Sequence, residues 1–347
     1  MSSNPFPPSP DRTGTRSTRR TRRTPRRIPY AAAVALGLAL TAAGLGGCST
    51  GARPPAAAGP AVSTSAAAPA PGVDSRERLT VDGGTREYLM HRPAADGGPR
   101  PLLIAFHGRG ADAENLRKQS GLDRAAEARG MLLVYPEALD KAWGAGTAPT
   151  DRRPDPDADV RFTEALVAEL VRTGRADPHR IYVAGFSNGG SMALRMAAQR
   201  PDLVAGAAAV SGELPTGAAA VKPTGPVPVL IVYGAEDPVR PLAGLPSPGP
   251  AAPGEEPITA TMSARASAEA FAAAGGAGSP AEEGKSGYDS VTWPAGPAGA
   301  EVRLLVMHGA GHTWPGSTVP PPAGFGSVST ALDASATVLD FLSTGRR

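Results

Sequence analysis

The chain has 347 residues, enough for one large domain or two small ones, and its 35 Lys and Arg against 32 Asp and Glu give a formal net charge of +3. Eight of the arginines lie within residues 12–27; without residues 1–47 the chain has 27 basic and 31 acidic residues, a net charge of −4. The positive charge therefore belongs to the N-terminal segment, and we expect no nucleic-acid partner.

The N-terminal segment has the pattern of an export signal. An uncharged, Ala- and Leu-rich run from Ile28 to Leu45 follows the arginines and leads into Leu-Gly-Gly-Cys at residues 45–48. A basic region, a short apolar core and a small-residue cleavage site are typical of a secretory signal peptide, and the run is too short for a membrane span. We expect residues 1–48 to be a signal peptide, exported by the general secretory route or, given the paired arginines, by the twin-arginine route.

Cys48 is the only cysteine of the chain, so an intramolecular disulfide is impossible. Its position after Leu-Gly-Gly resembles the lipobox of bacterial lipoproteins, whose cysteine receives a diacylglyceryl group; an ordinary cleavage site with an incidental thiol is the alternative. The resemblance implies lipidation at Cys48 and a membrane partner, since two or more acyl chains anchor a protein stably. We expect an extracytoplasmic protein, lipid-anchored to the outer face of the cell membrane or secreted.

The rest of the chain divides into a linker and a domain. Residues 49–73 consist mostly of Ala, Pro, Gly, Ser and Thr, a composition that favours a disordered linker. Residues 74–345 alternate short β-rich runs with helix-length amphipathic segments, and we expect them to form one domain. This alternation predicts an α/β fold with a mostly parallel central sheet and helices on both faces.

Continuous apolar runs, such as residues 102–106 and 229–233, are typical of strands buried on both faces of a sheet. The first two runs favour an antiparallel hairpin at the sheet edge. The expected strands are Arg76–Val81, Thr85–His91, Pro101–Phe106, Met131–Tyr135, Arg180–Ala184, Gly206–Val210, Val227–Tyr233 and Val302–His308. The expected helices are Ala113–Arg129, Asp159–Arg172, Gly189–Gln199, Thr261–Ala274 and Thr330–Leu342, with surface loops at Leu242–Pro257 and Gly275–Ser286.

The clearest motif is Gly-Phe-Ser-Asn-Gly at residues 185–189, which fits G-x-S-x-G. An expected strand precedes it and an expected helix follows it, which is the context of a nucleophile elbow in an α/β-hydrolase. Glycines flank Ser187 because the turn is too tight for Cβ atoms on either side. The motif predicts a nucleophilic Ser187, against the alternative of a Gly-rich turn with a capping serine.

In this fold the acid and the base follow the nucleophile in that order. Asp237 lies just after the strand 229–233, where parallel sheets carry functional side chains, and we assign it as the acid. The neighbouring Glu236 is the alternative, and a carboxylate that merely caps a turn is the non-catalytic interpretation.

Five histidines are candidates for the base, and three of them are set aside by position. His91 and His107 precede the serine, and His179 begins the strand before it. Of the other two, His312 lies in a glycine-rich loop beyond the last strand, whereas His308 ends that strand. We favour His312 because a loop can bring an imidazole over the sheet edge to the serine.

The segment Phe-His-Gly-Arg-Gly at residues 106–110 follows the third expected strand. In α/β-hydrolases one oxyanion donor comes from this loop and one from the residue after the nucleophile, so we assign the backbone N–H groups of Arg109 and Asn188. The same loop reads G-x-G-x-x-A, a dinucleotide fingerprint, but the acid expected about 20 residues later is not in place, since Glu137 comes late. We expect no cofactor.

A metal site is also not expected. Asp155, Asp157 and Asp159 have the spacing of a calcium loop, but Val160 and Leu166 stand where an EF-hand needs Gly and Glu. These aspartates are expected to cap the helix that follows.

The motifs together resemble the polyhydroxybutyrate depolymerase/feruloyl esterase group of α/β-hydrolases, and within it the LpqC-like esterase lipoproteins. The residues that carry the resemblance are His107-Gly108, Val134-Tyr135-Pro136, Trp143, residues 185–190 and Gly311-His312-Thr313-Trp314-Pro315-Gly316. The resemblance implies a serine esterase acting on hydroxyalkanoate, aryl (feruloyl-like) or acetyl esters, and supports Ser187, Asp237 and His312. Trp143 and Trp314 are candidates for pocket lining or for core packing.

The chain also departs from that group, because many members carry a Cys where it has Arg109, and further cysteines in disulfides. It also shows no separate polymer-binding module, so a soluble or short-chain ester is favoured over a solid polymer. Acyl transfer to a sugar or lipid hydroxyl, and a non-catalytic surface-binding lipoprotein, are the alternative functions. No feature of the sequence indicates an oligomeric state.

Overall fold

The computed structural model describes residues 72–94, 97–249, 257–297 and 299–344. The expected signal peptide, Cys48 and the expected linker up to residue 71 lie outside the described residues. Among the described helices, none has the length and apolar character that crossing a membrane requires.

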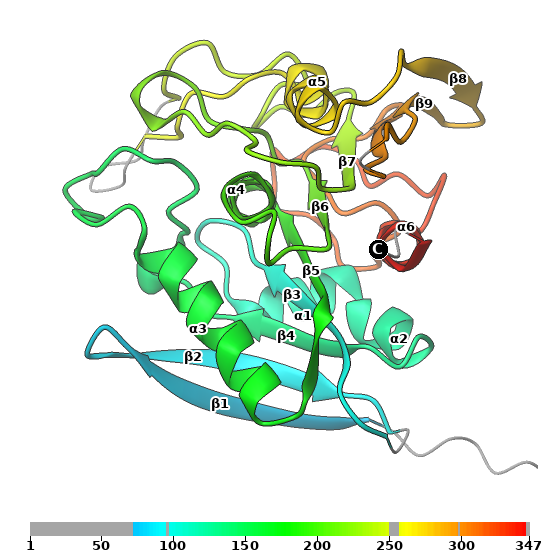
Figure 1. The fold of residues 1–347 in the computed structure, drawn as a ribbon. Coiled ribbons are helices and arrows are strands. Elements are labelled where there is room, and N and C mark those ends of the chain that lie inside the picture. The colour runs from blue at the N-terminus through cyan, green and yellow to red at the C-terminus, as the bar shows by residue number, and fades with distance from the viewer. Residues whose placement is uncertain (1–71, 95–96, 250–256, 298, 345–347) are drawn as a thin grey trace, which may run out of the picture. The chain divides into compact units, whose positions relative to one another are not determined.

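In the described ranges, ten strands form one sheet, accompanied by six helices and two 3-10 turns (Figure 1). The strands are β1 (Val73–Val81), β2 (Gly84–Arg92), β3 (Arg100–Phe106), β4 (Leu132–Pro136), β5 (Ala176–Phe186), β6 (Gly206–Val210), β7 (Val229–Gly234), β8 (Ala281–Lys285), β9 (Tyr288–Trp293) and β10 (Val302–Met307). The helices are α1 (Ala113–Ser120), α2 (Leu122–Glu127), α3 (Ala158–Arg172), α4 (Asn188–Gln199), α5 (Ala264–Ala274) and α6 (Ala334–Thr344), and the 3-10 turns are η1 (Leu139–Lys141) and η2 (Gly217–Ala219).

The strand order is β1-β2-β4-β3-β5-β6-β7-β10-β9-β8. The six strands from β4 to β10 in this order run parallel, and an antiparallel hairpin extends the sheet at each edge. The predicted α/β class, the mostly parallel sheet and the hairpin at the first edge are therefore confirmed. Since parallel strands share one direction, the loops after β3, β5, β7 and β10 all leave on the same side of the sheet. This side is formed by the carboxyl ends of the strands, not by an outer strand, and is the sheet edge at which the site lies.

Helices cover both faces of the sheet, as Figure 1 shows. On β3, Leu102 and Ile104 pack into the core under α3, α4 and α5, whereas Leu103 and Ala105 between them pack into the core under α1, α2 and α6. Successive strand residues point to opposite faces, so a strand covered on both sides needs an unbroken apolar run. The buried apolar side chains of β3 and β7 follow from this rule.

Two expected elements were wrong in detail. The helix expected at 113–129 is two helices, because Gly121 has a left-handed φ of 63° and its N–H bonds to the carbonyl oxygen of Arg117, which ends α1. The loop expected at 275–286 contains β8, whose five residues are all exposed and therefore give no apolar alternation. Of the other expected loop, residues 242–249 are described and contain no helix or strand.

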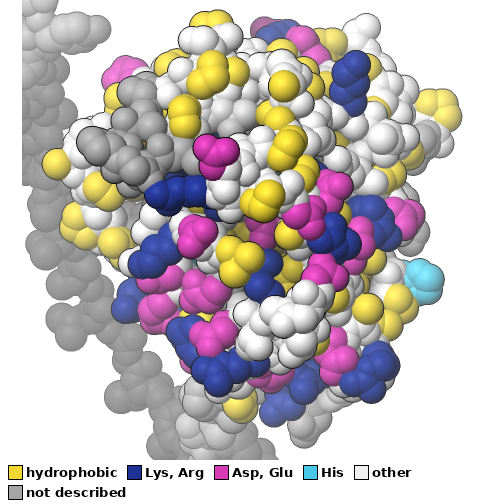
Figure 2. Space-filling model, turned by 90° about the vertical axis from the view of Figure 1, so that its left-hand side faces the viewer, with side chains coloured by type: hydrophobic (Ala, Val, Ile, Leu, Met, Phe, Trp, Pro, Cys, Tyr) yellow, Lys and Arg dark blue, Asp and Glu magenta, His cyan; other side chains and the backbone are white. Residues whose placement is uncertain are grey.

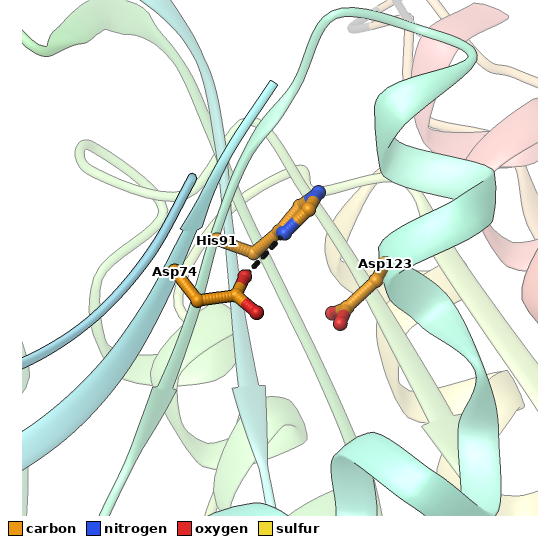
Figure 3. A group of neighbouring side chains, drawn as sticks. All are labelled: Asp74, His91 and Asp123. Carbon is orange, nitrogen blue, oxygen red and sulfur yellow. Dashed lines mark hydrogen bonds and ion pairs between the residues drawn. The ribbon is translucent and has the colours of Figure 1, made fainter. Parts of the chain in front are cut away.

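An ionic cluster joins the first hairpin to the helices at its side (Figure 3). Nδ1 of His91 lies 2.7 Å from a carboxylate oxygen of Asp74, and its Nε2 lies 3.1 Å from Glu127. The Arg117 guanidinium bonds to the carboxylates of both Asp74 and Asp123. Asp74, His91 and Asp123 could in principle hold a metal ion, but Arg117 already supplies a cation between the two aspartates.

Acidic and basic side chains also alternate elsewhere on the surface. Figure 2 shows Lys and Arg beside Asp and Glu over the lower part of one face. Arg161 of α3, for example, pairs with Asp82 and with Asp155. Such exposed pairs contribute little each to stability, typically about 0–1 kcal/mol.

We expect Arg117→Met to lower the free energy of unfolding by about 1–2 kcal/mol at pH 7, because two carboxylates lose a charged hydrogen-bond donor. Burial alone would raise the pKa of Asp74, but hydrogen bonds from His91 and Arg117 outweigh it and hold this pKa below its ordinary value of 3.8. The stabilisation is therefore present above pH 4 and lost as the pH falls through the lowered pKa. Urea denaturation from pH 7 to pH 3 measures it.

The control is Arg78→Met, which removes a pair with Glu87 from a side chain that is 71% exposed and should change stability little. A difference between wild type and Arg117→Met that stayed constant down to pH 3 would contradict the role assigned to Asp74.

Candidate active site

The turn between β5 and α4 places Ser187 at the sheet edge with a backbone that few residues adopt. Its φ is 55° and its ψ is −118°, a strained conformation that costs about 1–3 kcal/mol. A Cβ at Gly185 would lie 2.2 Å from the carbonyl oxygen of Gly189, and one at Gly189 would lie 2.1 Å from that of Phe106. The two glycines are therefore required, and the turn has the form of a nucleophile elbow.

The structure brings the three predicted side chains, Ser187, His312 and Asp237, into one hydrogen-bonded chain. Nε2 of His312 lies 2.8 Å from Oγ of Ser187, and its Nδ1 lies 2.7 Å from a carboxylate oxygen of Asp237. The other oxygen of Asp237 accepts the backbone N–H groups of Val239 and Arg240. These bonds fix the carboxylate, which orients the imidazole toward the serine.

The two alternative residues lie elsewhere. Glu236 is exposed, although its neighbour Asp237 is buried. His308 is about half exposed and pairs with Asp289 on β9, at 3.0 Å. Among the described residues, neither side chain makes a hydrogen bond or an ion pair with Ser187.

The loop that carries His312 is held in place by backbone hydrogen bonds and by ring contacts. The N–H of His312 bonds to the carbonyl oxygen of Phe325, and that of Gly311 to Ser327. The rings of Phe186 and Phe325 flank the imidazole, with centroids at 5.0 and 5.4 Å. These ring contacts and backbone hydrogen bonds together hold the imidazole at the serine.

The expected oxyanion donors lie on either side of Ser187. Asn188 begins α4, so its N–H has no acceptor within the helix. The loop with Arg109 passes close to the serine, because a Cβ at Gly108 would lie 3.6 Å from that of Ser187. Arg109 and Asn188 both line the cavity that contains Ser187.

His107, which the sequence analysis set aside, anchors the oxyanion loop. It is fully buried; its Nδ1 bonds to the carbonyl oxygen of Gly108, and its Nε2 accepts the N–H of Ala138. Burial lowers the pKa of His107 below 6.5, so the imidazole is neutral with its proton on Nδ1. The clue in the sequence was its place at the end of a buried strand.

Trp143 and the side chain of Asn188 complete this anchoring. The indole N–H of Trp143 donates to the carbonyl oxygen of His107 at 2.9 Å. The Asn188 amide bonds to both the N–H and the carbonyl oxygen of Trp143, at 2.7 and 3.1 Å. Trp143 thus ties the oxyanion loop to the first residue of α4, and acts by position rather than as a wall of the main cavity.

The loop after Trp143 is held by buried charges. Asp159 accepts the N–H of Gly144 and pairs with Arg86 at 2.8 Å. Arg195 donates to the carbonyl oxygens of Gly144 and Gly146. It also pairs with Asp157. Of the aspartates expected to cap this helix, Asp157 stands at the start of α3 without a capping hydrogen bond from its side chain, whereas Asp155 accepts the N–H of Asp157 at 3.0 Å.

A cavity of about 560 Å³ opens at Ser187 and His312. Most of its wall is apolar, and its polar lining residues include Ser187 and His312 as well as Asn115 and Gln119 of α1. The apolar wall residues include Phe186, Val239, Ile258, Trp314, Val319, Pro320, Pro321, Pro322, Phe325 and Val328. Such a cavity suits an apolar group attached to a reactive polar centre.

The dinucleotide interpretation of residues 108–113 meets a physical obstacle. A bound phosphate would lie at the N-terminus of α1, where backbone N–H groups point outward. There a carboxylate oxygen of Glu137 already accepts the N–H of Ala113 at 3.2 Å, and Asp112 caps the helix by accepting the N–H of Asn115. Two negative charges occupy the place that a phosphate would need.

Comparison with known proteins gives the family. A sequence model described as phospholipase/carboxylesterase matches residues 153–245, which include the Ser187 turn. The chain is 44% identical over 284 residues to a protein named "Putative esterase NocK" from Nocardia uniformis subsp. tsuyamanensis, a match that covers 77% of this chain and 82% of that one.

Two further proteins are similar to part of this chain. It is 30% identical over 161 residues to feruloyl esterase B from Piromyces equi, covering 44% of this chain and 29% of that protein. A solved structure of an acetyl xylan esterase from Aspergillus awamori covers 69% of this chain and 94% of its own, at 15% identity and a TM-score of 0.49. From the long match at 44% identity and the family model, this chain belongs to the phospholipase/carboxylesterase family of α/β-hydrolases.

Proposed function

We propose that this protein hydrolyses carboxylic esters through an acyl-enzyme on Ser187. The observation that carries the proposal is the hydrogen-bonded chain from Asp237 through His312 to the strained Ser187. His312 takes the serine proton as Oγ attacks the ester carbonyl, and Asp237 stabilises the imidazolium that forms.

The negative oxygen of the tetrahedral intermediate then rests on the N–H groups of Arg109 and Asn188. One such donor typically contributes about 3–4 kcal/mol to lowering the barrier. His312 returns its proton to the leaving alcohol, and a water molecule releases the acyl group by the same steps in reverse.

The resemblance to polyhydroxybutyrate depolymerases, feruloyl esterases and LpqC-like lipoproteins supports hydroxyalkanoate, aryl or acetyl esters as the substrate class. Acyl transfer would use the same residues, with an alcohol in place of water. No feature of the cavity favours it, so hydrolysis is the function we propose. The 2.8 Å contact between imidazole and serine argues against a non-catalytic binding protein.

We also propose that the protein acts outside the cytoplasm, anchored through a lipid on Cys48. The arginine-rich start, the apolar run and the Leu-Gly-Gly-Cys sequence at residues 45–48 support this.

Replacing the nucleophile or the base should abolish turnover. We expect Ser187→Ala and His312→Ala each to lower kcat for p-nitrophenyl acetate by about 10⁴-fold or more, because neither nucleophile nor base can act alone. Ser187→Ala should also lose labelling by a fluorophosphonate probe. His308→Ala is the matched control and should keep full activity. Activity that survives in Ser187→Ala would remove the proposed mechanism.

Trp143→Phe should lower kcat by about tenfold and leave KM nearly unchanged, because the carbonyl of His107 loses its donor and the oxyanion loop loosens. The phenyl ring keeps the aromatic contact with Phe106. Trp293→Phe, on β9 and away from the cavity, is the control and should leave kcat unchanged. Equal kinetics of Trp143→Phe and wild type would show that this bond does not position the loop.

In an actinobacterial host, the full chain should partition with the membrane fraction and incorporate radiolabelled palmitate. Cys48→Ala should incorporate no label and should not be retained as a lipoprotein, because the thiol is the site of acylation. Fractionation and autoradiography measure both. Membrane-bound, labelled Cys48→Ala would refute the anchor at this residue.

A further inference from the structure

A second, smaller cavity adjoins the catalytic one. It has a volume of about 80 Å³, and three residues line both cavities: Arg109, Asn188 and Arg240. Ser187 and His312 line only the larger cavity. The smaller cavity therefore begins at the oxyanion donor and lies away from the base.

This placement assigns each half of an ester to one cavity. In the tetrahedral intermediate the reacting carbon bears Oγ of Ser187, the oxyanion, the leaving oxygen and the acyl chain. The leaving oxygen must lie near Nε2 of His312, which protonates it, so the alcohol occupies the larger, apolar cavity. The acyl chain takes the remaining direction, past Asn188 and toward the smaller cavity.

The smaller cavity is polar and offers a nearly buried cation. Its lining includes the hydroxyl-bearing residues Ser191, Thr150, Thr259 and Thr261, and none of its described lining residues is acidic. Arg240 is 5% exposed, and one of its terminal nitrogens donates to Oγ of Ser191 at 2.8 Å. Its guanidinium forms no ion pair with any carboxylate in the described part of the chain.

A guanidinium buried to this degree normally has a hydrogen-bonded anion beside it. Two buried acids lie close to it along the chain or in the contacts, and neither pairs with the guanidinium: the carboxylate of Asp237 bonds to His312 and to backbone N–H groups, and that of Glu213 bonds to the hydroxyl of Thr261 at 2.5 Å, its other oxygen having no partner among the described residues. Burial raises the pKa of Glu213 to about 7, although the bond from Thr261 and the charge of Arg240 act against this shift. Neither Glu213 nor Asp237 therefore supplies the hydrogen-bonded anion that the Arg240 guanidinium lacks within the described residues.

The backbone of Arg240 is fixed by the same turn that holds the catalytic acid. Its N–H donates to Asp237 at 2.8 Å, and its carbonyl oxygen accepts the hydroxyl of Tyr233. With the backbone fixed and one nitrogen held by Ser191, the guanidinium is preorganised at the wall between the two cavities. A guanidinium in fixed orientation is the side chain best suited to bind a carboxylate through two parallel hydrogen bonds.

We propose that the smaller cavity is the acyl subsite and that Arg240 makes it selective for a short acyl chain ending in a carboxylate, as in a half-ester of a short dicarboxylic acid. The proposal rests on the esterase function proposed above and narrows its substrate class. The apolar cavity receives the alcohol, and the carboxylate of the acyl chain pairs with Arg240.

The test compares two esters of one alcohol with the purified full chain. Monobenzyl succinate and benzyl 4-methylpentanoate differ only in that a carboxylate replaces an isopropyl group of nearly equal shape. Release of benzyl alcohol, followed by chromatography, gives kcat/KM for each. We expect wild type to favour the succinate by tenfold or more; a preference for the neutral ester overturns the proposal without need of any variant.

Arg240→Met should lower this ratio at least tenfold, mainly through KM for the succinate. The matched control is Arg153→Met, which removes the same charge from the wall of the same cavity, where Arg153 donates to the carbonyl oxygens of Leu139 and Ala142. It should change the ratio by less than threefold. If the ratio of the two kcat/KM values fell equally in the two variants, the effect would be a general one of charge, and a specific role for Arg240 would be refuted.

The two proposals fail in different ways. If wild type is labelled by a fluorophosphonate and hydrolyses the neutral ester but shows no preference for the succinate, only the acyl subsite is refuted. If it is not labelled and hydrolyses neither ester, the esterase function itself fails. Should Arg240→Met not fold, Ser191→Ala serves instead, because it frees the guanidinium from its one described side-chain acceptor and should lower the same ratio.

Discussion

The strained turn at Ser187 determines where every other group of the site has to lie. Its positive φ lifts the side chain off the sheet edge, and the turn closes only because Gly185 and Gly189 leave room for neighbouring carbonyl oxygens. Once Oγ has this position, the base must come from a loop at the same edge, and the parallel sheet supplies such loops after β7 and β10. Asp237 and His312 lie in them, far apart in the chain but joined by one hydrogen bond.

A second set of interactions turns loops into rigid supports. Trp143 bonds to the backbone of His107 and to the side chain of Asn188, so the two sides of the expected oxyanion hole are tied together through one residue. The backbone of Arg240 supports Asp237, while its side chain reaches Ser191 in the first turn of α4. Preorganised donors stabilise a developing charge without reorganising during the reaction, so the bonds that hold Asn188 and Arg240 in place bear on the chemistry.

Local motifs and the order of residues along the chain were enough to predict the three side chains of the candidate site, but not the contacts that support them. Ser187 could be recognised from its flanking elements, and Asp237 and His312 from their place after later strands; the structure brings the three together. The bonds of His107 and Trp143 could not be predicted, because they join irregular loops whose backbone no periodic pattern encodes. The strand β8 escaped for a related reason, since its residues are all exposed and only its pairing with β9 makes it a strand.

Two of the four buried side-chain polar atoms that have no partner in the described part of the chain follow β6, close to the site; the other two are the Nε atoms of Arg86 and Arg303. After β6, Ser211 has a φ of 52° and a buried hydroxyl without a hydrogen-bond partner in the described part of the chain. Two residues later, one carboxylate oxygen of Glu213 is also buried without such a partner. Each such group costs stability, which the apolar layers on both faces of the sheet must offset. A fold selected for stability alone would replace these groups with apolar side chains. The polar groups of Ser211 and Glu213 are therefore better explained by binding and catalysis at the neighbouring Ser187 and Arg240 than by stability.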